Sequence, residues 1–264
     1  MKLETLTWGT GETRAVFLHG FAGSAKSFSH LEPLLGDVLT ATCVELPGHA
    51  GTPVAASWDD AVESIAALLD DRTTLFGYSQ GARLALAAAQ RFPHKLERLV
   101  LESGAAGLRR RHDRLLRRRS DAALAELIVT RGVEAFVAHW EGLPLFSGLR
   151  ALPEVEQRAL RERRASHTAE GLAGALQTMG QGAQPDLWPG LQGLRVPTLL
   201  ITGAADEKYT RLARQMIADL PLAWRVSFRG IGHAPHLECP EAYAAEVRSF
   251  LAARWLAEPQ EHAP

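Results

Sequence analysis

The chain has 264 residues, of which 46% are hydrophobic and 22% are charged, and its formal net charge is −1 at pH 7. This balance is ordinary for a globular protein and gives no electrostatic reason to expect nucleic acid or an anionic membrane as a partner. The length is sufficient for one α/β domain with an insertion. The two cysteines, Cys43 and Cys239, lie far apart and outside metal-ligand spacing, so we expect neither a disulfide scaffold nor a metal site.

The first residues, Met-Lys-Leu-Glu, do not form the charged and apolar regions of a signal peptide. The sequence contains no run of about 18 apolar residues that could cross a bilayer. We therefore expect a cytoplasmic protein without membrane insertion. The sequence leaves open whether the protein is a monomer or a homo-oligomer.

Short apolar strands alternate with helical patterns over the first hundred residues. Strands are predicted at residues 3–8, 14–18, 40–45, 73–76 and 99–102, and helices at residues 25–35, 58–69 and 84–90. Ser57 is predicted to be the N-cap of the second helix, with Asp60 as the acid of a capping box. This alternation predicts an α/β fold with a mostly parallel sheet that helices cover on both faces.

The alternation stops between residues 106 and 191, where only helical segments rich in Arg, Ala and Leu are present. The pattern then resumes with strands at residues 195–203 and 224–228 and helices at residues 211–220 and 241–255. We therefore predict that residues 1–105 and 192–264 form the core, and that residues 106–191 form an inserted helical cap.

A Gly-Tyr-Ser-Gln-Gly sequence at residues 77–81 stands between a predicted strand and a predicted helix. A strand, a turn too tight for side chains at its flanks and a helix together form the nucleophile elbow of α/β-hydrolases. The helix N-terminus beneath Ser79 would favour negative charge on its oxygen. Because Gly-x-Ser-x-Gly also occurs in ordinary strand–helix turns, the motif needs partners elsewhere in the chain.

Two further polar residues follow predicted strands in the order that a catalytic triad requires. Asp206 follows the strand at residues 195–203, and His233 follows the strand at residues 224–228. Because the carboxyl ends of parallel strands lie together, Ser79, Asp206 and His233 can converge. His233 would accept the serine proton, and Asp206 would fix the imidazole tautomer and stabilise the charged ring. Each residue alone could belong to an ordinary turn, but their joint placement favours a triad.

Other groups near these loops receive supporting roles. The loop after the second strand reads His-Gly-Phe-Ala-Gly-Ser, and its small residues allow an amide to point at a reacting oxygen. We predict that the N–H groups of Phe21 and Gln80 form an oxyanion hole and that His19 braces the loop. Glu102, at the end of another strand, is an alternative acid, and His236 is expected to be a structural neighbour.

Arginine is concentrated in the predicted cap and beside the elbow. Residues 106–170 contain 13 Arg against 9 Asp plus Glu, and the densest stretch is at residues 109–119. Charge runs of this kind usually form solvated helix faces, and most of these arginines fit that description. Arg83 differs, because it lies four residues past Ser79 on the first helical turn under the expected cleft. An arginine there could bind a carboxylate through two parallel hydrogen bonds.

With these residues, the chain resembles the 2-succinyl-6-hydroxy-2,4-cyclohexadiene-1-carboxylate (SHCHC) synthases, menaquinone-pathway enzymes of the α/β-hydrolase superfamily. The resemblance covers nearly the whole length. It includes the elbow with Tyr78 before the serine and Arg83 four after it, the acid loop at residues 203–209 and the histidine loop at residues 232–238.

The cap contributes further to this resemblance. Arg117, four residues before an aspartate, Trp140 in His-Trp-Glu-Gly-Leu-Pro and Arg164 in Arg-Ala-Ser-His match substrate-binding residues of the family. His167 stands where the family usually has Asn after Arg-x-Ser. Arg163 therefore remains an alternative to Arg164. Because arginines crowd around Arg117, Arg118 remains an alternative to Arg117.

The resemblance implies a lyase that needs no metal or organic cofactor. Its substrate would be 2-succinyl-5-enolpyruvyl-6-hydroxy-3-cyclohexene-1-carboxylate, a small tricarboxylate whose three charges need cationic partners such as Arg83, Arg117 and Arg164. Ser79, activated by His233, would remove a ring proton, and pyruvate would leave in a 2,5-elimination that yields SHCHC.

Two other functions remain compatible with the same residues. One is a serine hydrolase that acts on a carboxylic ester or on a carbon–carbon bond of a dienone. The arginine set argues against it, because a neutral substrate has no use for several inward cations. The other is a non-catalytic ligand receptor with this fold, against which the intact serine, aspartate and histidine set argues.

Overall fold

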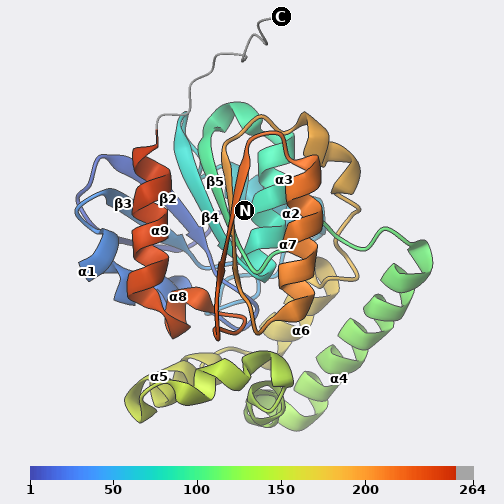
Figure 1. Ribbon diagram of the computed structural model, residues 1–264. Coiled ribbons are helices and arrows are strands. Elements are labelled where there is room, and N and C mark those ends of the chain that lie inside the picture. The colour runs from blue at the N-terminus through green and yellow to red at the C-terminus, as the bar shows by residue number, and fades with distance from the viewer. Residues whose placement is uncertain (254–264) are drawn as a thin grey trace, which may run out of the picture.

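The structure, a computed structural model, describes residues 1–253. Seven strands form one sheet in the order β1-β3-β2-β4-β5-β6-β7 (Figure 1). Strand β1 runs antiparallel to β3, and every other neighbouring pair is parallel, which confirms the predicted α/β class. The strands are β1 (Thr5–Trp8), β2 (Thr13–Leu18), β3 (Leu39–Val44), β4 (Thr73–Tyr78), β5 (Leu96–Glu102), β6 (Thr198–Gly203) and β7 (Ala223–Phe228).

Helices cover both faces of this sheet (Figure 1). One face packs against α2 (Trp58–Ala66), α3 (Gln80–Arg91), η4 (Trp188–Gly193) and α7 (Glu207–Asp219). The other face packs against η1 (Ala25–Leu31), α1 (Glu32–Leu35) and α9 (Pro240–Ala252). Two short helices, η2 (Pro93–Lys95) and α8 (Pro235–Glu238), lie in loops between these elements.

The central strands divide their side chains between the two layers of the core. Phe17 and Phe76 point to the α9 side, where their rings stack with centroids 4.2 Å apart. Leu18 and Leu75, their chain neighbours, point to the α3 side. Because successive strand residues alternate between faces, a strand buried on both sides must be apolar at consecutive positions, as β2 and β4 are.

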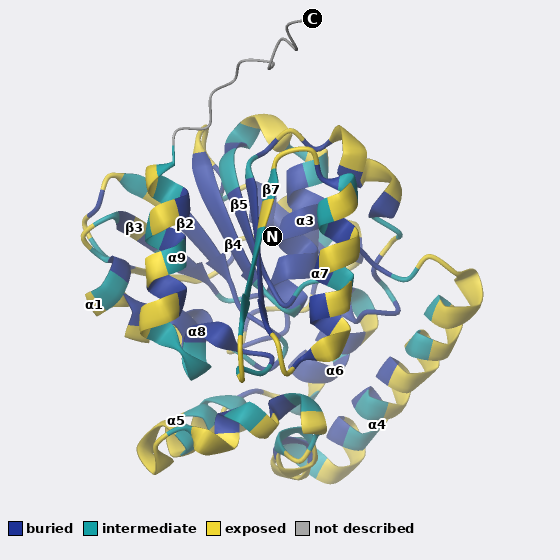
Figure 2. Cartoon of the chain, in the orientation of Figure 1, coloured by how far each residue is buried: buried dark blue, intermediate teal, exposed yellow. Residues whose placement is uncertain are grey.

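Of the five helical elements between β5 and β6 in the chain, η4 packs on the sheet, and the other four lie beside the end of the sheet near α8 (Figure 1). They are α4 (Arg111–Glu141), η3 (Pro144–Ala151), α5 (Glu154–Ala165) and α6 (Ala169–Met179). We refer to these four elements as the cap. Helix α4 has a kink at Gly132, and α5 contains no buried residue. Figure 2 shows that α4 and α5 expose much more of their surface than the strands and α3 do.

Several predicted element boundaries were wrong for local reasons. The helix expected at residues 25–35 is a 3-10 helix followed by one α-helical turn. Helix α3 begins at Gln80 rather than at residue 84, directly after the elbow serine. Ser57 caps α2 as predicted, but the Asp60 carboxylate accepts from the N–H of Ala56 instead of completing a capping box. The predicted end of the last helix, residue 255, lies outside the described residues.

The Phe17 stack provides a test of the core. Replacing Phe17 by Ala should lower the free energy of unfolding by about 3–5 kcal/mol, since it removes a fully buried ring and leaves a cavity. Leu6→Ala on the edge strand, where 36% of the residue is exposed, should cost about 0.5 kcal/mol or less. Urea unfolding of both variants measures the difference, and equal losses would contradict this assignment of the core.

Candidate active site

The elbow at the end of β4 holds Ser79 in an unusual backbone conformation. Ser79 has φ 51° and ψ −102°, and α3 begins at the next residue. A residue other than glycine at positive φ is strained, and such strain is the signature of a nucleophile elbow. The tight turn is possible because Gly81 has no side chain: a Cβ there would overlap the carbonyl oxygen of Leu18. Ser79 is thereby lifted above the end of the sheet.

A continuous chain of hydrogen bonds links the three residues predicted as a triad. The Nδ1 of His233 lies 2.6 Å from the Oδ2 of Asp206, and its Nε2 lies 3.0 Å from the Oγ of Ser79. Because an ionised carboxylate only accepts hydrogen bonds, Nδ1 carries the proton and Nε2 is free to accept the serine hydroxyl. Asp206 also caps α7, where its Oδ1 accepts from the N–H of Tyr209. This arrangement can generate an alkoxide-like oxygen on Ser79.

Glu238 braces the loop that carries His233, a role that the sequence interpretation missed. Its carboxylate accepts from the N–H of Gly232 at 2.6 Å and from the N–H of Ala234 at 3.0 Å. The hydroxyl of Ser103 adds a hydrogen bond to the carbonyl of His233. A glutamate five residues after a histidine is a weak sequence signal, since nothing in that spacing shows where the carboxylate points.

Glu102, the alternative acid, forms hydrogen bonds with His236 rather than with His233. Its Oε1 accepts from both the backbone N–H and the Nδ1 of His236, at 3.1 Å and 2.7 Å. Both side chains are buried, and Tyr78 packs edge-on against the His236 ring. Glu102 therefore does not contact His233, and the alternative is wrong. The expectation that His236 is a structural neighbour agrees with this geometry.

The loop predicted to supply an oxyanion amide is held by two buried histidines. His19 donates from Nδ1 to the carbonyl of Gly20, 2.8 Å away, and accepts at Nε2 from the N–H of Leu46. His49 accepts at Nε2 from the N–H of Ala22, which has φ 58°. The N–H of Phe21, between these two anchored residues, has no acceptor within residues 1–253. Together with the N–H of Gln80, the first residue of α3, it remains our prediction for the oxyanion hole.

Arg83 on α3 and Arg117 on α4 both donate hydrogen bonds to the segment at residues 179–181. The Nη1 of Arg83 donates to the carbonyl of Met179 in the cap, and the Nε2 of Gln80 donates to the same oxygen. Arg117 pairs with Asp121 at 2.7 Å and donates to Gln181. Burial, with a smaller contribution from the charge of Arg117, lowers the pKa of Arg83 to about 10. Arg83 stays charged at neutral pH.

Two other cationic side chains lie in this region, Lys208 and Arg118. Burial and the charge of Arg117 lower the pKa of Lys208, which therefore belongs to the same cluster although the sequence interpretation gave it no role. Arg118, the alternative to Arg117, instead donates from Nε to the carbonyl of Gly182. The structure thus brings Arg117, rather than Arg118, close to Arg83.

A small cavity beside Ser79 is lined by most of the remaining predicted residues. It is lined by Phe21, Tyr78 and Ser79 from the core and by both Arg163 and Arg164 from the cap. Trp140 is not part of this lining; its ring packs against Phe21 with centroids 5.4 Å apart. The structure therefore places Arg163 and Arg164, the two alternatives for the second cap arginine, in the same cavity as Ser79.

Within residues 1–253, no cluster of His, Cys, Asp and Glu could hold a metal ion. Both cysteines are free thiols, and burial raises the pKa of Cys43 to about 12 and that of Cys239 to about 11. None of the helices in the described part of the chain is long and apolar enough to span a membrane.

Comparison with known proteins agrees with this fold. Residues 15–246 match the sequence model of the Alpha/beta hydrolase family. The chain is therefore a member of the α/β-hydrolase family.

Within the α/β-hydrolase family, the chain is similar to one group of enzymes in particular. A Bacillus subtilis (strain 168) protein, provisionally named 2-succinyl-6-hydroxy-2,4-cyclohexadiene-1-carboxylate synthase, is 36% identical, with 89% of each chain covered. The synthase of that name from Serratia proteamaculans (strain 568) is 34% identical, covering 89% of this chain and 92% of its own. The structure of MenH from S. aureus has a TM-score of 0.89 at 30% identity, covering 95% and 97%. Within the α/β-hydrolases, the chain belongs to the SHCHC synthase family.

The buried histidines of the oxyanion loop predict a pH dependence of stability. Burial lowers the pKa of His19 from 6.5 to about 3 and that of His49 well below 6.5. Between pH 6.5 and pH 3 the unfolded chain therefore binds more protons than the folded one, so stability is complete above pH 6.5 and decreases as the pH falls. The slope should be about 1.4 kcal/mol per pH unit for each histidine.

Urea unfolding between pH 7.5 and pH 5 measures this slope. His19→Asn, which can keep one hydrogen bond but cannot be protonated, should flatten the slope by about one proton even if its stability at pH 7.5 is lower. A free energy of unfolding that stays constant or rises from pH 6.5 to pH 5 would contradict the proposed buried neutral state.

Proposed function

We propose that this protein eliminates pyruvate from 2-succinyl-5-enolpyruvyl-6-hydroxy-3-cyclohexene-1-carboxylate to form SHCHC in menaquinone biosynthesis. Membership of the SHCHC synthase family supports this reaction. The single observation that carries it is the cavity beside Ser79, which the catalytic serine shares with the cationic side chains of Arg163 and Arg164. A lyase acting on a tricarboxylate needs both features at one place.

In the proposed mechanism, Ser79 acts as a base and no acyl-enzyme forms. His233 accepts the hydroxyl proton at Nε2 while Asp206 stabilises the charged ring through Nδ1. The serine oxygen then removes the ring proton next to the succinyl ketone, and the electron pair moves onto the ketone oxygen. The N–H groups of Phe21 and Gln80 would stabilise that enolate. As the enolate collapses, the bond to the enolpyruvyl oxygen breaks and pyruvate leaves after taking up the proton.

The residues 106–191 supply, in this proposal, most of the cations for the three carboxylates. Arg117 and Arg164 come from the cap and Arg83 from α3, and an arginine fork can hold a carboxylate through two hydrogen bonds. Tyr78 and Trp140 would contact the substrate from the core and from the cap. The reaction requires neither a metal nor an organic cofactor, because every step is a proton transfer or an elimination.

The substrate is a soluble metabolite, and we propose that the protein acts in the cytoplasm without nucleic acid or membrane insertion. The closely balanced net charge of −1 supports this proposal, since it provides no general attraction to polyanions.

Ser79→Ala tests the mechanism. The rate of pyruvate release should fall by about a thousandfold or more, because the base is lost, while the free energy of unfolding changes by about 1 kcal/mol or less. Coupled detection of pyruvate measures the rate, and ultraviolet absorbance follows SHCHC in parallel. Near-normal turnover would remove the triad from the mechanism. A mass adduct on Ser79 during turnover of the parent protein would favour the serine hydrolase instead.

Arg117→Ala and Arg118→Ala form a matched pair. If Arg117 binds a substrate carboxylate, its loss should lower kcat/KM by about 30-fold or more, equivalent to about 2 kcal/mol. Arg118→Ala should change kcat/KM by less than about threefold, since Arg118 bonds a backbone carbonyl in the folded cap. Arg117→Lys, which keeps the charge but not the planar fork, should recover part of the loss. A larger loss in Arg118→Ala would transfer the role to Arg118.

A further inference from the structure

Two cavities of very different size lie on the cap side of the catalytic serine. The cavity that contains Ser79 has a volume of about 40 Å³, whereas one within the cap has a volume of about 750 Å³. The first is large enough for a water molecule or two, but sites for small organic ligands usually measure about 300–1,000 Å³. A cyclohexene with three carboxylates therefore fits the cap cavity and cannot fit the catalytic one in this conformation.

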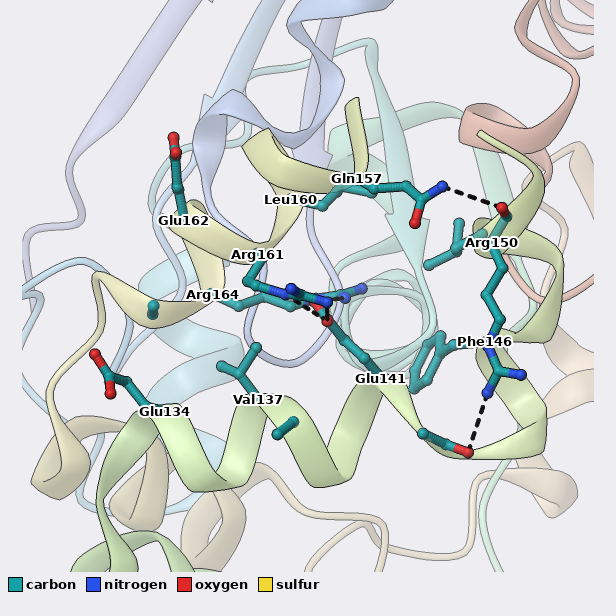
Figure 3. Close-up of a pocket in the computed structure, with 14 residues that line it drawn as sticks. Glu134, Val137, Glu141, Phe146, Arg150, Gln157, Leu160, Arg161, Glu162 and Arg164 are labelled. Atoms are coloured by element: carbon teal, nitrogen blue, oxygen red, sulfur yellow. Dashed lines mark hydrogen bonds and ion pairs between the residues drawn. The ribbon is translucent and has the colours of Figure 1, made fainter. Parts of the chain in front are cut away.

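The two cavities share a wall. Four side chains line both of them: Phe146, Leu149, Leu160 and Arg164. Arg164 is the charged member of this wall, and its guanidinium lies 5.6 Å from the centre of the Phe146 ring. The cap cavity otherwise combines apolar side chains with polar and charged ones: Gln157, the cations of Arg150 and Arg161, and the carboxylates of Glu134, Glu141 and Glu162 (Figure 3). An anionic ligand in this cavity therefore has cationic partners but must compete with carboxylates that are already there.

Glu141 forms an ion pair with Arg164, the arginine that a substrate carboxylate would need. Its Oε1 lies 3.0 Å from the Nη1 of Arg164, and its Oε2 lies 2.9 Å from Arg161. Figure 3 shows the three side chains meeting in the cavity between α4 and α5. The Glu141 and Arg164 side chains are only 18% and 11% exposed, so water screens this pair less than a surface pair. Among residues 1–253, Arg164 has no other hydrogen-bond acceptor.

Helix α5, which carries both arginines, is held in place mainly by polar contacts. It contains no buried residue. Arg163 donates to the carbonyl of Lys26 in the core, and Gln157 donates to the carbonyls of Arg150 and Leu152. A helix attached in this way can shift at small cost, because no large apolar surface has to be exposed. The wall between the two cavities is thus formed in part by the helix of the cap in which no residue is buried.

We propose that the cap cavity is where the anionic substrate first binds, and that Glu141 is the counter-ion which a substrate carboxylate displaces from Arg164. This inference rests on the proposed function, since it concerns the same tricarboxylate. The exchange costs little free energy, because Glu141 keeps its ion pair with Arg161 through Oε2 when its Oε1 releases Arg164. The released guanidinium lines the cavity of Ser79 and can accompany the carboxylate toward it. Glu141 thereby also selects against ligands that lack a carboxylate.

Glu141→Gln tests this exchange, with Glu162→Gln as its matched control. Glu162 lines the same cavity, but its carboxylate has no ion-pair or hydrogen-bond partner among the described residues, and Figure 3 shows it pointing away from Arg164. Propane-1,2,3-tricarboxylate serves as a non-reacting probe, and calorimetry measures its dissociation constant. Glu141→Gln should bind the probe about tenfold more tightly than the parent, since a competing charge is gone. Glu162→Gln should bind it within about twofold of the parent.

Two further measurements keep the test specific. In an Arg164→Ala background, Glu141→Gln should no longer change the affinity, because the exchange needs Arg164. Unfolding by urea verifies that each variant is folded. On the proposed substrate, Glu141→Gln should lower KM about tenfold with kcat unchanged within about twofold.

Each outcome has one meaning. Unchanged or weaker probe binding by Glu141→Gln would overturn the exchange, and weaker binding would make Glu141 a residue that orients Arg164. Equal tightening by Glu141→Gln and Glu162→Gln would also overturn it, because the cause would then be the general field of the cavity. If the parent protein binds the probe but releases no pyruvate, the proposed function fails while the affinity test of Glu141 still stands.

Discussion

The N-terminus of α3 packs directly against the end of β2. This close approach is possible only because Gly81 has no side chain, since a Cβ there would overlap the carbonyl oxygen of Leu18. A second backbone contact joins the other two loops of the site. A Cβ on Gly203, at the end of β6, would overlap the carbonyl oxygens of Ile231 and Gly232. The first contact places the serine elbow against the loop that follows β2. The second places the acid loop against the histidine loop, and the 2.6 Å hydrogen bond between Asp206 and His233 depends on it.

The histidines around the site perform two different tasks, and their partners explain the difference. His19 and His49 accept hydrogen bonds from backbone N–H groups, which requires an unprotonated nitrogen, and burial lowers the pKa of both. They can fix a loop but do not take up a second proton at neutral pH. His233 instead bonds a carboxylate on one nitrogen and a hydroxyl on the other, so that proton arrival at Nε2 is compensated by Asp206. Buried histidines in one small region thus divide into two that brace a loop and one that, in the proposed mechanism, accepts a proton.

The sheet, most of the helices and the chain order of the serine, acid and histidine loops could be predicted from the sequence. Those features depend on apolar runs, glycine contacts and strand ends, which are local in sequence. The limits of the helices near Gln80 and Glu207 could not be predicted, because there Ser79 and Asp206 serve as N-caps and as site residues at once. Membership of the SHCHC synthase family, expected from the motifs, is confirmed by the comparisons.

The contacts of the cap were much less predictable. Helix propensity and charge identify a helical insertion, but they do not show which of many arginines faces which acid. Glu141 and Arg164 are 23 residues apart on two helices, and their pairing depends on how α5 packs against α4. The same applies to Glu102, which stands at a strand end where an acid could serve the triad but bonds His236 instead. Long-range pairing of ionisable groups needs the three-dimensional arrangement.

Each of the three arginines proposed to bind substrate already has an acceptor inside the folded chain. Arg83 donates to the carbonyl of Met179, Arg117 pairs with Asp121 and Arg164 pairs with Glu141. An unpaired cation in a partly dehydrated cleft would destabilise the empty protein, and these acceptors remove that cost. Substrate binding then exchanges one oxygen acceptor for another rather than burying new charge. Affinity for the tricarboxylate therefore depends on how readily each internal acceptor is released, and a neutral ester, which offers no carboxylate in exchange, leaves the three pairs intact.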